Sequence, residues 1–229
     1  MENRSDEEIS DGPDQIGCRG TVSKVTDEID AHPPNKRQRT IKSITITSVD
    51  IGVLHLAFTY ARINVETSVW RVEEILQKKM INIKDFGCDL LTCPLYHGKC
   101  VTDYLRHLVN RESCFKDCNE LIIERQPPQG LQNVQEFFIN EFRDKVELIP
   151  PRSMQKWYHI HNFVGTEEER RDQRKIASEN IATKLLVPFE HTLDGLERKH
   201  DVADSVLQLF YYLVRENIKR NPGRSKYFL

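Results

Sequence analysis

The chain has 229 residues and a formal net charge of -2 at pH 7, a length that accommodates one substantial domain and a tail. The near-neutral charge neither favours nor excludes a nucleic-acid partner. The sequence shows no signal peptide and no apolar run of membrane-spanning length, which argues against secreted and membrane-spanning proteins. We therefore expect a soluble intracellular protein whose six cysteines are reduced thiols or metal ligands rather than disulfides.

Residues 1–40 are poor in large apolar side chains, and their first part is acidic. Such a segment buries too little surface to offset the entropy of ordering it, so we expect a disordered N-terminal tail. The tail closes with the basic cluster Lys36-Arg37-Gln38-Arg39. This cluster fits a nuclear address or a phosphate-contacting arm, and it fits a solvated linker before the first strand equally well.

Residues 41–229 show strands first, and then strands that alternate with helices. The pattern predicts a mixed sheet, three antiparallel strands followed by parallel strands, with helices on its faces. The predicted strands are Ile44–Val49, Leu54–Asn64, Ser68–Ile75, Leu121–Arg125 and Val146–Ile149, the last one stopped by Pro150-Pro151. The predicted helices are Val101–Arg111, Leu131–Phe142, about Thr166 to Leu186, and Asp201–Leu213.

Four carboxylates stand where these apolar elements begin or end. Asp50 ends the first strand, Glu124 ends the fourth, and Asp201 and Asp204 open the last helix. An acid on an apolar element is costly to bury unless a cation lies beside it. No basic residue lies inside the three segments that carry these acids, Ile44–Asp50, Leu121–Glu124 and Asp201–Leu213. An all-oxygen site for Mg²⁺ or Mn²⁺ is therefore the simplest solution, and it indicates phosphodiester chemistry.

The acids can meet if the strands that carry Asp50 and Glu124 are parallel neighbours. Asp201 and Asp204 are three residues apart and share one helix face, which can dock over the strand ends. Two divalent ions about 3.5–4 Å apart can then activate a water and stabilise the leaving oxygen. Gly52, two residues after Asp50, would let a substrate backbone approach closely.

Each acid also has a simpler interpretation. Asp50 can belong to an ordinary strand-ending turn, and Glu124 can pair with Arg125. Asp201 can be a helix N-cap with Asp204 as a favourable acid in the first turn, which needs no metal.

Three motifs resemble the RuvC-like Holliday junction resolvases, particularly the branch of large DNA viruses such as poxviruses and iridoviruses. They are Ser48-Val-Asp-Ile-Gly52, Ile123-Glu-Arg-Gln-Pro-Pro128 and Arg198-Lys-His-Asp-Val-Ala-Asp204. The resemblance covers roughly residues 43–218, and fungal mitochondrial resolvases are more distant relatives. It implies a ribonuclease H-like fold, a homodimer, Mg²⁺ dependence, and paired nicks across a four-way DNA junction. By position, the acids at 50, 124, 201 and 204 match the metal-binding acids of that family. A viral protein of this kind would work in the host cytoplasm or nucleus.

The same family carries basic residues after its fifth strand. The segment Pro151–Lys156 matches that region, so Lys156 is a candidate catalytic residue that stabilises transition-state charge, with Arg152 as its companion. Lys175, together with Arg174, resembles a second basic position that contacts DNA. An exposed loop lysine without a catalytic role is the alternative for Lys156.

A cysteine-containing insertion around residues 86–118 is not explained by this resemblance. Cys93, His97, Cys114 and Cys118 have spacings that a structural zinc ion can use. The remaining cysteine spacings fit no strong template, and buried free thiols are common. We therefore do not expect structural zinc.

The sequence predicts a metal-dependent, structure-selective DNA endonuclease that resolves four-way junctions and other branched DNA, in recombination, repair and genome replication. The alternatives are a ribonuclease H or flap nuclease of the same fold, or a non-catalytic nucleic-acid-binding protein. Two related cuts favour a symmetric homodimer. The helices that start near Val101 and Leu131, with Phe137 and Phe138, are the expected interface, unless these aromatic residues pack on the sheet.

Overall fold

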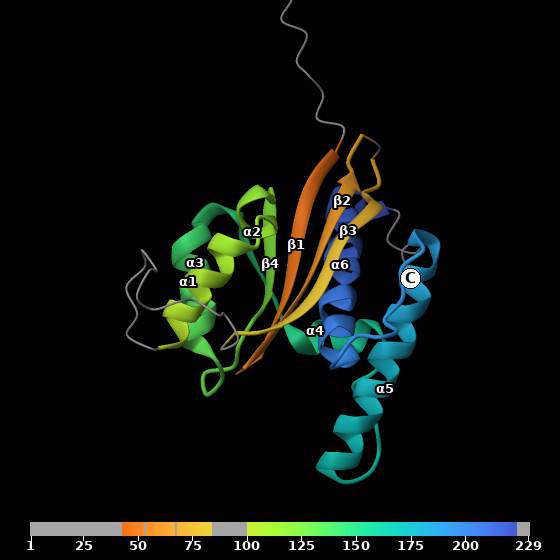
Figure 1. The fold of residues 1–229 in the computed structure, drawn as a ribbon. Coiled ribbons are helices and arrows are strands. Elements are labelled where there is room, and N and C mark those ends of the chain that lie inside the picture. Colours follow the sequence, from red (N-terminus) through yellow and green to blue (C-terminus); the bar gives the residue numbers. More distant parts are fainter. Residues whose placement is uncertain (1–42, 53, 67, 84–99, 224–229) are drawn as a thin grey trace, which may run out of the picture. The chain divides into compact units, whose positions relative to one another are not determined.

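The computed structural model describes residues 43–52, 54–66, 68–83 and 100–223 (Figure 1). The predicted tail 1–40 and most of the cysteine-containing insertion lie outside these ranges. The strands are β1 (Ser43–Ile51), β2 (His55–Asn64), β3 (Arg71–Asn82), β4 (Glu120–Glu124) and β5 (Val146–Ile149). The helices are α1 (Val101–Arg111), α2 (Cys114–Asp117), α3 (Gln132–Phe142), α4 (Pro151–Trp157), α5 (Glu167–Leu186) and α6 (Lys199–Arg220), with 3₁₀ turns at Arg143–Lys145 and Val187–Phe189.

The five strands form one mixed sheet in the order β3-β2-β1-β4-β5. The strands β1, β2 and β3 form an antiparallel meander, and β4 lies parallel to both β1 and β5. Both the predicted meander and the predicted parallel pairing of the strands that carry Asp50 and Glu124 are therefore confirmed.

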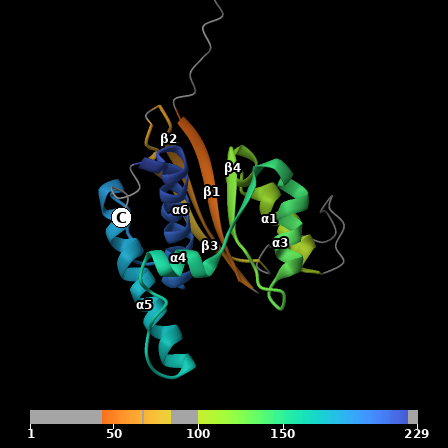
Figure 2. The ribbon, with the colours of Figure 1, turned by 180° about the vertical axis from the view of Figure 1, so that it is seen from behind.

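Helices cover both faces of the sheet (Figures 1 and 2). On one face, Ile46 and Ile122 pack with Val206 and other residues of α6, and α4 and α5 complete that layer. On the other face, Val49 and Ile123 pack with residues of α1, α2 and α3. Because side chains alternate along a strand, Asp50 points to the same face as Ile46, and Glu124 to the same face as Ile122. Both acids therefore face the α6 layer.

Two elements extend by six residues or more beyond their predicted ends, and β1 extends by one or two residues at each end. The third strand was expected to end at Ile75, but β3 continues to Asn82 because it pairs with β2 along its whole length and buries Ile81. The last helix was expected over Asp201–Leu213, but α6 starts at Lys199 and ends at Arg220.

The helix α4 was not predicted. The sequence pattern indicates only that Pro150-Pro151 ends the fifth strand, whereas Pro151 occupies the first position of this helix. Proline is well tolerated there, because the backbone N–H it lacks would have no partner within the helix and its fixed φ suits a helix start.

The expected helical interface is wrong with respect to its aromatic residues. Phe137 and Phe138 of α3 are 8% and 0% exposed and belong to the core beneath α1 and α3. The ring of Phe138 stacks on Phe115, with 5.9 Å between ring centroids. These side chains pack on the sheet and are not available to a partner.

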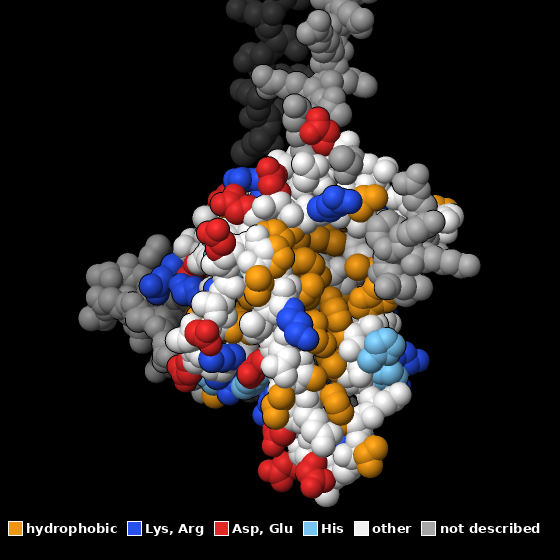
Figure 3. Space-filling model, turned by 90° about the vertical axis from the view of Figure 1, so that its right-hand side faces the viewer, with side chains coloured by type: hydrophobic (Ala, Val, Ile, Leu, Met, Phe, Trp, Pro, Cys, Tyr) orange, Lys and Arg blue, Asp and Glu red, His pale blue; other side chains and the backbone are white. Residues whose placement is uncertain are grey.

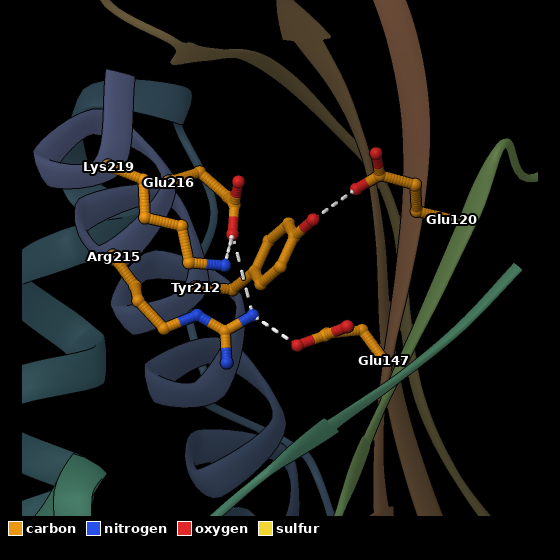
Figure 4. Close-up of polar contacts among 6 residues, drawn as sticks. All are labelled: Glu120, Glu147, Tyr212, Arg215, Glu216 and Lys219. Atoms are coloured by element: carbon orange, nitrogen blue, oxygen red, sulfur yellow. Dashed lines mark hydrogen bonds and ion pairs between the residues drawn. The ribbon is translucent and has the colours of Figure 1, made fainter. Parts of the chain in front are cut away.

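The C-terminal half of α6 is fixed to the sheet by polar contacts (Figure 4). The Tyr212 hydroxyl donates to Glu120 on β4 at 2.7 Å, and Arg215 donates to Glu147 on β5 at 2.5 Å. Arg215 and Lys219 also contact Glu216. These contacts set the position of α6 along the strands, at the end of the helix opposite to Asp201 and Asp204.

The glycine after β1 has a role in the turn itself. A Cβ on Gly52 would lie 2.4 Å from the carbonyl oxygen of His55. The turn between β1 and β2 therefore requires glycine for its own closure, whether or not a substrate approaches there. None of the described helices is long and apolar enough to span a membrane.

Candidate active site

A cavity of about 200 Å³ lies where β1 and β4 end beneath the first turns of α6. Asp50, Glu124, Asp201 and Asp204 all line it, so the structure brings the predicted acids together from three elements. The other lining residues are Met154, Gln155, Ile160, Arg171, Arg174, Lys175, Ser178, Arg198, His200 and Gln208.

The sheet register places the first two acids side by side. Val49 of β1 is paired with Ile123 of β4, and Asp50 and Glu124 each follow directly. The helix α6 packs against both strands, and its first turns present Asp201 and Asp204 one helical turn apart. Parallel pairing and helical spacing are therefore sufficient to bring the acids to one place.

Burial and neighbouring negative charges raise the pKa values of three of the acids, Asp50, Glu124 and Asp204. Burial raises the pKa of Asp50 well above its usual value, and the charges of Asp204, Glu124 and Asp201 raise it further. Burial, and then the charge of Asp204, raise the pKa of Glu124 to about 7. Burial also raises the pKa of Asp204 to about 6, against a hydrogen bond from Ser178 that lowers it. A cluster of this kind is unfavourable when fully ionised unless cations enter it.

Neutral amides surround the acids. Gln126 donates to Glu124 Oε2 at 3.4 Å, while its own Oε1 accepts from the backbone N–H of Leu131. Gln208 donates to the carbonyl of Val49 at 3.4 Å. These groups were not identified from the sequence, because a glutamine near an acid carries no distinctive spacing.

Asp201 is already engaged by Arg198, which precedes α6, and by His200 in the first turn of the helix. Arg198 Nε donates to Asp201 Oδ2 at 2.5 Å, and His200 Nε2 lies 3.1 Å from Oδ1. Within the part of the chain that the structure describes, no group of three or more His, Cys, Asp or Glu side chains is arranged to hold a metal ion as it stands. The donor set itself fits Mg²⁺ or Mn²⁺, because it consists of carboxylate oxygens.

The predicted basic residues divide into two groups. Arg174 and Lys175 of α5 line the cavity, together with Arg171 on the same helix face. Lys156 and Arg152 of α4 are exposed and do not line it, whereas Met154 and Gln155 do. The cations nearest the acids are therefore those of α5 and Arg198, and the catalytic role of Lys156 stays a prediction.

Two of the cysteines considered for zinc lie in the core. Cys114 and Cys118 are each 1% exposed and pack with Phe115. Burial raises the pKa of the Cys114 thiol to about 12 and also raises the pKa of Cys118. Cys93 and His97, the other two members of that set, lie outside the described residues.

No known family profile and no curated protein matches the sequence. Several solved structures, however, match the fold of the chain. Fowlpox virus resolvase, crystallised with its substrate Holliday junction DNA, matches with a TM-score of 0.50 and 15% identity, over 74% of this chain and 97% of that one. The yeast mitochondrial Holliday junction resolvase matches with a TM-score of 0.46 and 15% identity, over 80% and 84% of the two chains. Thermus thermophilus RuvC matches with a TM-score of 0.42 and 10% identity, over 74% and 96%. The likeness to the fowlpox protein confirms the predicted fold: this chain has a mixed sheet flanked by helices, and it shares that fold with the fowlpox protein.

Proposed function

We propose that the protein is a metal-dependent, structure-selective DNA endonuclease that resolves four-way junctions and other branched DNA by paired nicks. The observation that carries this proposal is the convergence of Asp50, Glu124, Asp201 and Asp204 in one cavity bordered by arginine and lysine side chains. The fowlpox resolvase of the same fold was crystallised with junction DNA. The reaction would serve DNA recombination, repair and genome replication.

The four carboxylates would hold the divalent cations, Mg²⁺ with Mn²⁺ as a substitute, and we propose two ions per site. Bound ions supply an activated water and stabilise charge on the leaving oxygen. The chain itself fixes the ligands: Ser178 donates to Asp204, and Gln126 donates to Glu124.

Phosphate contacts come from two places in this proposal. Arg174 and Lys175, with Arg171, hold the phosphate nearest the acids, because they line the same cavity. Lys156 and Arg152 lie exposed on α4, so we propose that they contact the DNA backbone beside the cavity. Such contacts provide affinity that falls with salt concentration.

The proposal predicts the outcome of a substrate panel. The purified protein is incubated with a four-way junction, a flap, a linear duplex and an RNA–DNA hybrid of related sequence, with Mg²⁺ or with chelator. We expect two symmetric nicks in the junction, only with Mg²⁺, and little cleavage of the duplex. Cleavage of the RNA strand alone would instead indicate a ribonuclease H, and cleavage of the flap alone a flap nuclease. Binding without any cleavage would indicate a non-catalytic nucleic-acid-binding protein.

We also propose that the protein acts as a homodimer, because two related cuts need two sites with the symmetry of the substrate. Hydrophobic side chains are exposed on the face of the molecule that carries α5 (Figure 3). Ile176 of α5 is 60% exposed, and Val187, directly after this helix, is 65% exposed. Exposed apolar surface of this kind is typical of protein contacts.

A dimer predicts two linked results. The wild-type protein should sediment as a dimer and convert a cruciform plasmid directly to the linear form. Ile176→Gln should shift the equilibrium toward monomer if the α5 face is the interface. A wild-type monomer that releases singly nicked circles would contradict the dimer, and a fully dimeric Ile176→Gln variant would exclude only this location.

A further inference from the structure

Arg198 makes the most direct contact to any of the four acids. Its Nε lies 2.5 Å from Asp201 Oδ2, while His200 Nε2 is near Oδ1. The Asp201 side chain is only 15% exposed, whereas that of Arg198 is 38% exposed. The carboxylate is thus enclosed within the site, and the guanidinium approaches it from the side open to solvent.

The backbone at Arg198 is unusual for an arginine. It has φ 51° and ψ 55°, the left-handed region, and it precedes α6 without a side-chain capping bond. Residues with a Cβ rarely adopt this region. A cation is also unfavourable at a helix start, which is the positive end of the helix dipole.

The acids supply the attraction that offsets these costs. Asp201, Glu197 and Asp50 all raise the pKa of Arg198, after the hydrogen bond to Asp201. In turn, the charge of Arg198 lowers the pKa of Asp50. The guanidinium therefore acts as a counter-cation for Asp50 as well as for Asp201.

A divalent ion in this cluster needs the same carboxylate. The guanidinium and a divalent ion compete for Asp201, because two cations a few ångströms apart repel each other and each weakens the binding of the other. A ligand that requires a minor state of the protein has its affinity reduced by the population of that state. Occupancy of Asp201 by Arg198 therefore weakens cation binding.

We propose that Arg198 is a positioning residue that occupies Asp201 until divalent cations enter the acid cluster, and that it then turns away from Asp201 toward the basic residues of α5 in the same cavity. This inference rests on the proposed metal-dependent function. The released guanidinium joins Arg171, Arg174 and Lys175 along the same cavity. That concentration of positive charge favours an anionic phosphate among these side chains, so cation entry prepares the cavity for DNA.

The test measures Mn²⁺ affinity directly, without DNA and at one pH, by calorimetry. Arg198→Gln removes the competing charge, and we expect its dissociation constant for Mn²⁺ to fall by about fivefold or more. Arg198→Lys keeps a cation and should remain close to the wild type. Lys199→Gln is the matched control: it removes the adjacent charge, which pairs with Asp194 and does not line the cavity, and it should change the constant by less than about twofold.

The direction in which the Mn²⁺ affinity changes in the Arg198 variants separates this role from a merely structural one. A structural Arg198 would hold Asp201 in place, so its loss would weaken Mn²⁺ binding. Arg198→Gly is a second variant, because glycine adopts the left-handed region freely and should fold while giving the same tighter binding. Affinities of Arg198→Gln and Arg198→Gly equal to or weaker than that of Lys199→Gln would overturn the proposal. A wild type that binds no Mn²⁺, or Asp50→Asn that binds it equally well, would instead refute the metal centre, and the inference with it.

Discussion

Asp50→Asn and Glu124→Gln should each reduce cleavage of a four-way junction by about a thousandfold or more, since bound metal ions supply several kcal/mol of transition-state stabilisation. Both substitutions keep the shape of the side chain and remove the charge that would hold the cations. Junction affinity should change little, because it depends mainly on phosphate contacts made by basic residues. Single-turnover cleavage and a binding titration with the same labelled junction measure the two quantities.

Glu120→Gln provides a control in the same strand as Glu124→Gln. Glu120 begins β4 and accepts a hydrogen bond from Tyr212 (Figure 4), and it does not line the cavity. Glutamine can still accept that bond, so this variant should cleave at the wild-type rate. If Glu124→Gln cleaves as fast as Glu120→Gln with Mg²⁺ present, the assignment of the metal ligands is wrong.

As the pH rises from about 4 to about 7, the free energy of unfolding of the metal-free protein should fall. Folding raises the pKa of Glu124 from 4.5 to about 7 and that of Asp204 from 3.8 to about 6. An acid whose pKa is raised by folding contributes stability that is complete below its unfolded pKa and is lost as the pH rises through its folded pKa. At 1.36 kcal/mol per unit, the loss for Glu124 is roughly 3 kcal/mol.

Urea denaturation with chelator at pH 5 and pH 8 measures this loss. Glu124→Gln should remove most of the loss of unfolding free energy that is caused by ionisation of Glu124. The variant should therefore be more stable than the wild type at pH 8 and similar to it at pH 5. Mn²⁺ should stabilise the wild type more at pH 8 than at pH 5, because it binds the ionised acids. Equal pH dependence of the wild type and Glu124→Gln would contradict the electrostatic account of the cluster.

The positions of the acids could be predicted because each rests on a short-range rule. Alternation along β1 and β4 decides the face on which Asp50 and Glu124 lie, and helical spacing puts Asp201 and Asp204 together. Parallel pairing of the two strands then follows from the order of strands and helices. Each rule acts within one element or between two neighbours.

Other features depend on contacts that the sequence pattern does not encode. The aromatic face of α3 has the same spacing whether Phe137 and Phe138 face the sheet or a partner. A Pro-Pro pair ends a strand and also begins a helix, so α4 and the exposure of Lys156 were not determined. The contact of Arg198 with Asp201 requires a left-handed backbone that no residue type in this segment indicates.

The attachment of α6 at its far end constrains how this chain can change in evolution. Tyr212 and Arg215 tie one end of the helix to β4 and β5, while Asp201 and Asp204 lie at the other. One residue inserted between these ends would rotate the acids by about 100° relative to the attached end. Substitutions in the intervening turns preserve the alignment, but a gain or loss of single residues does not. Related genes should therefore differ here in composition and agree in residue count.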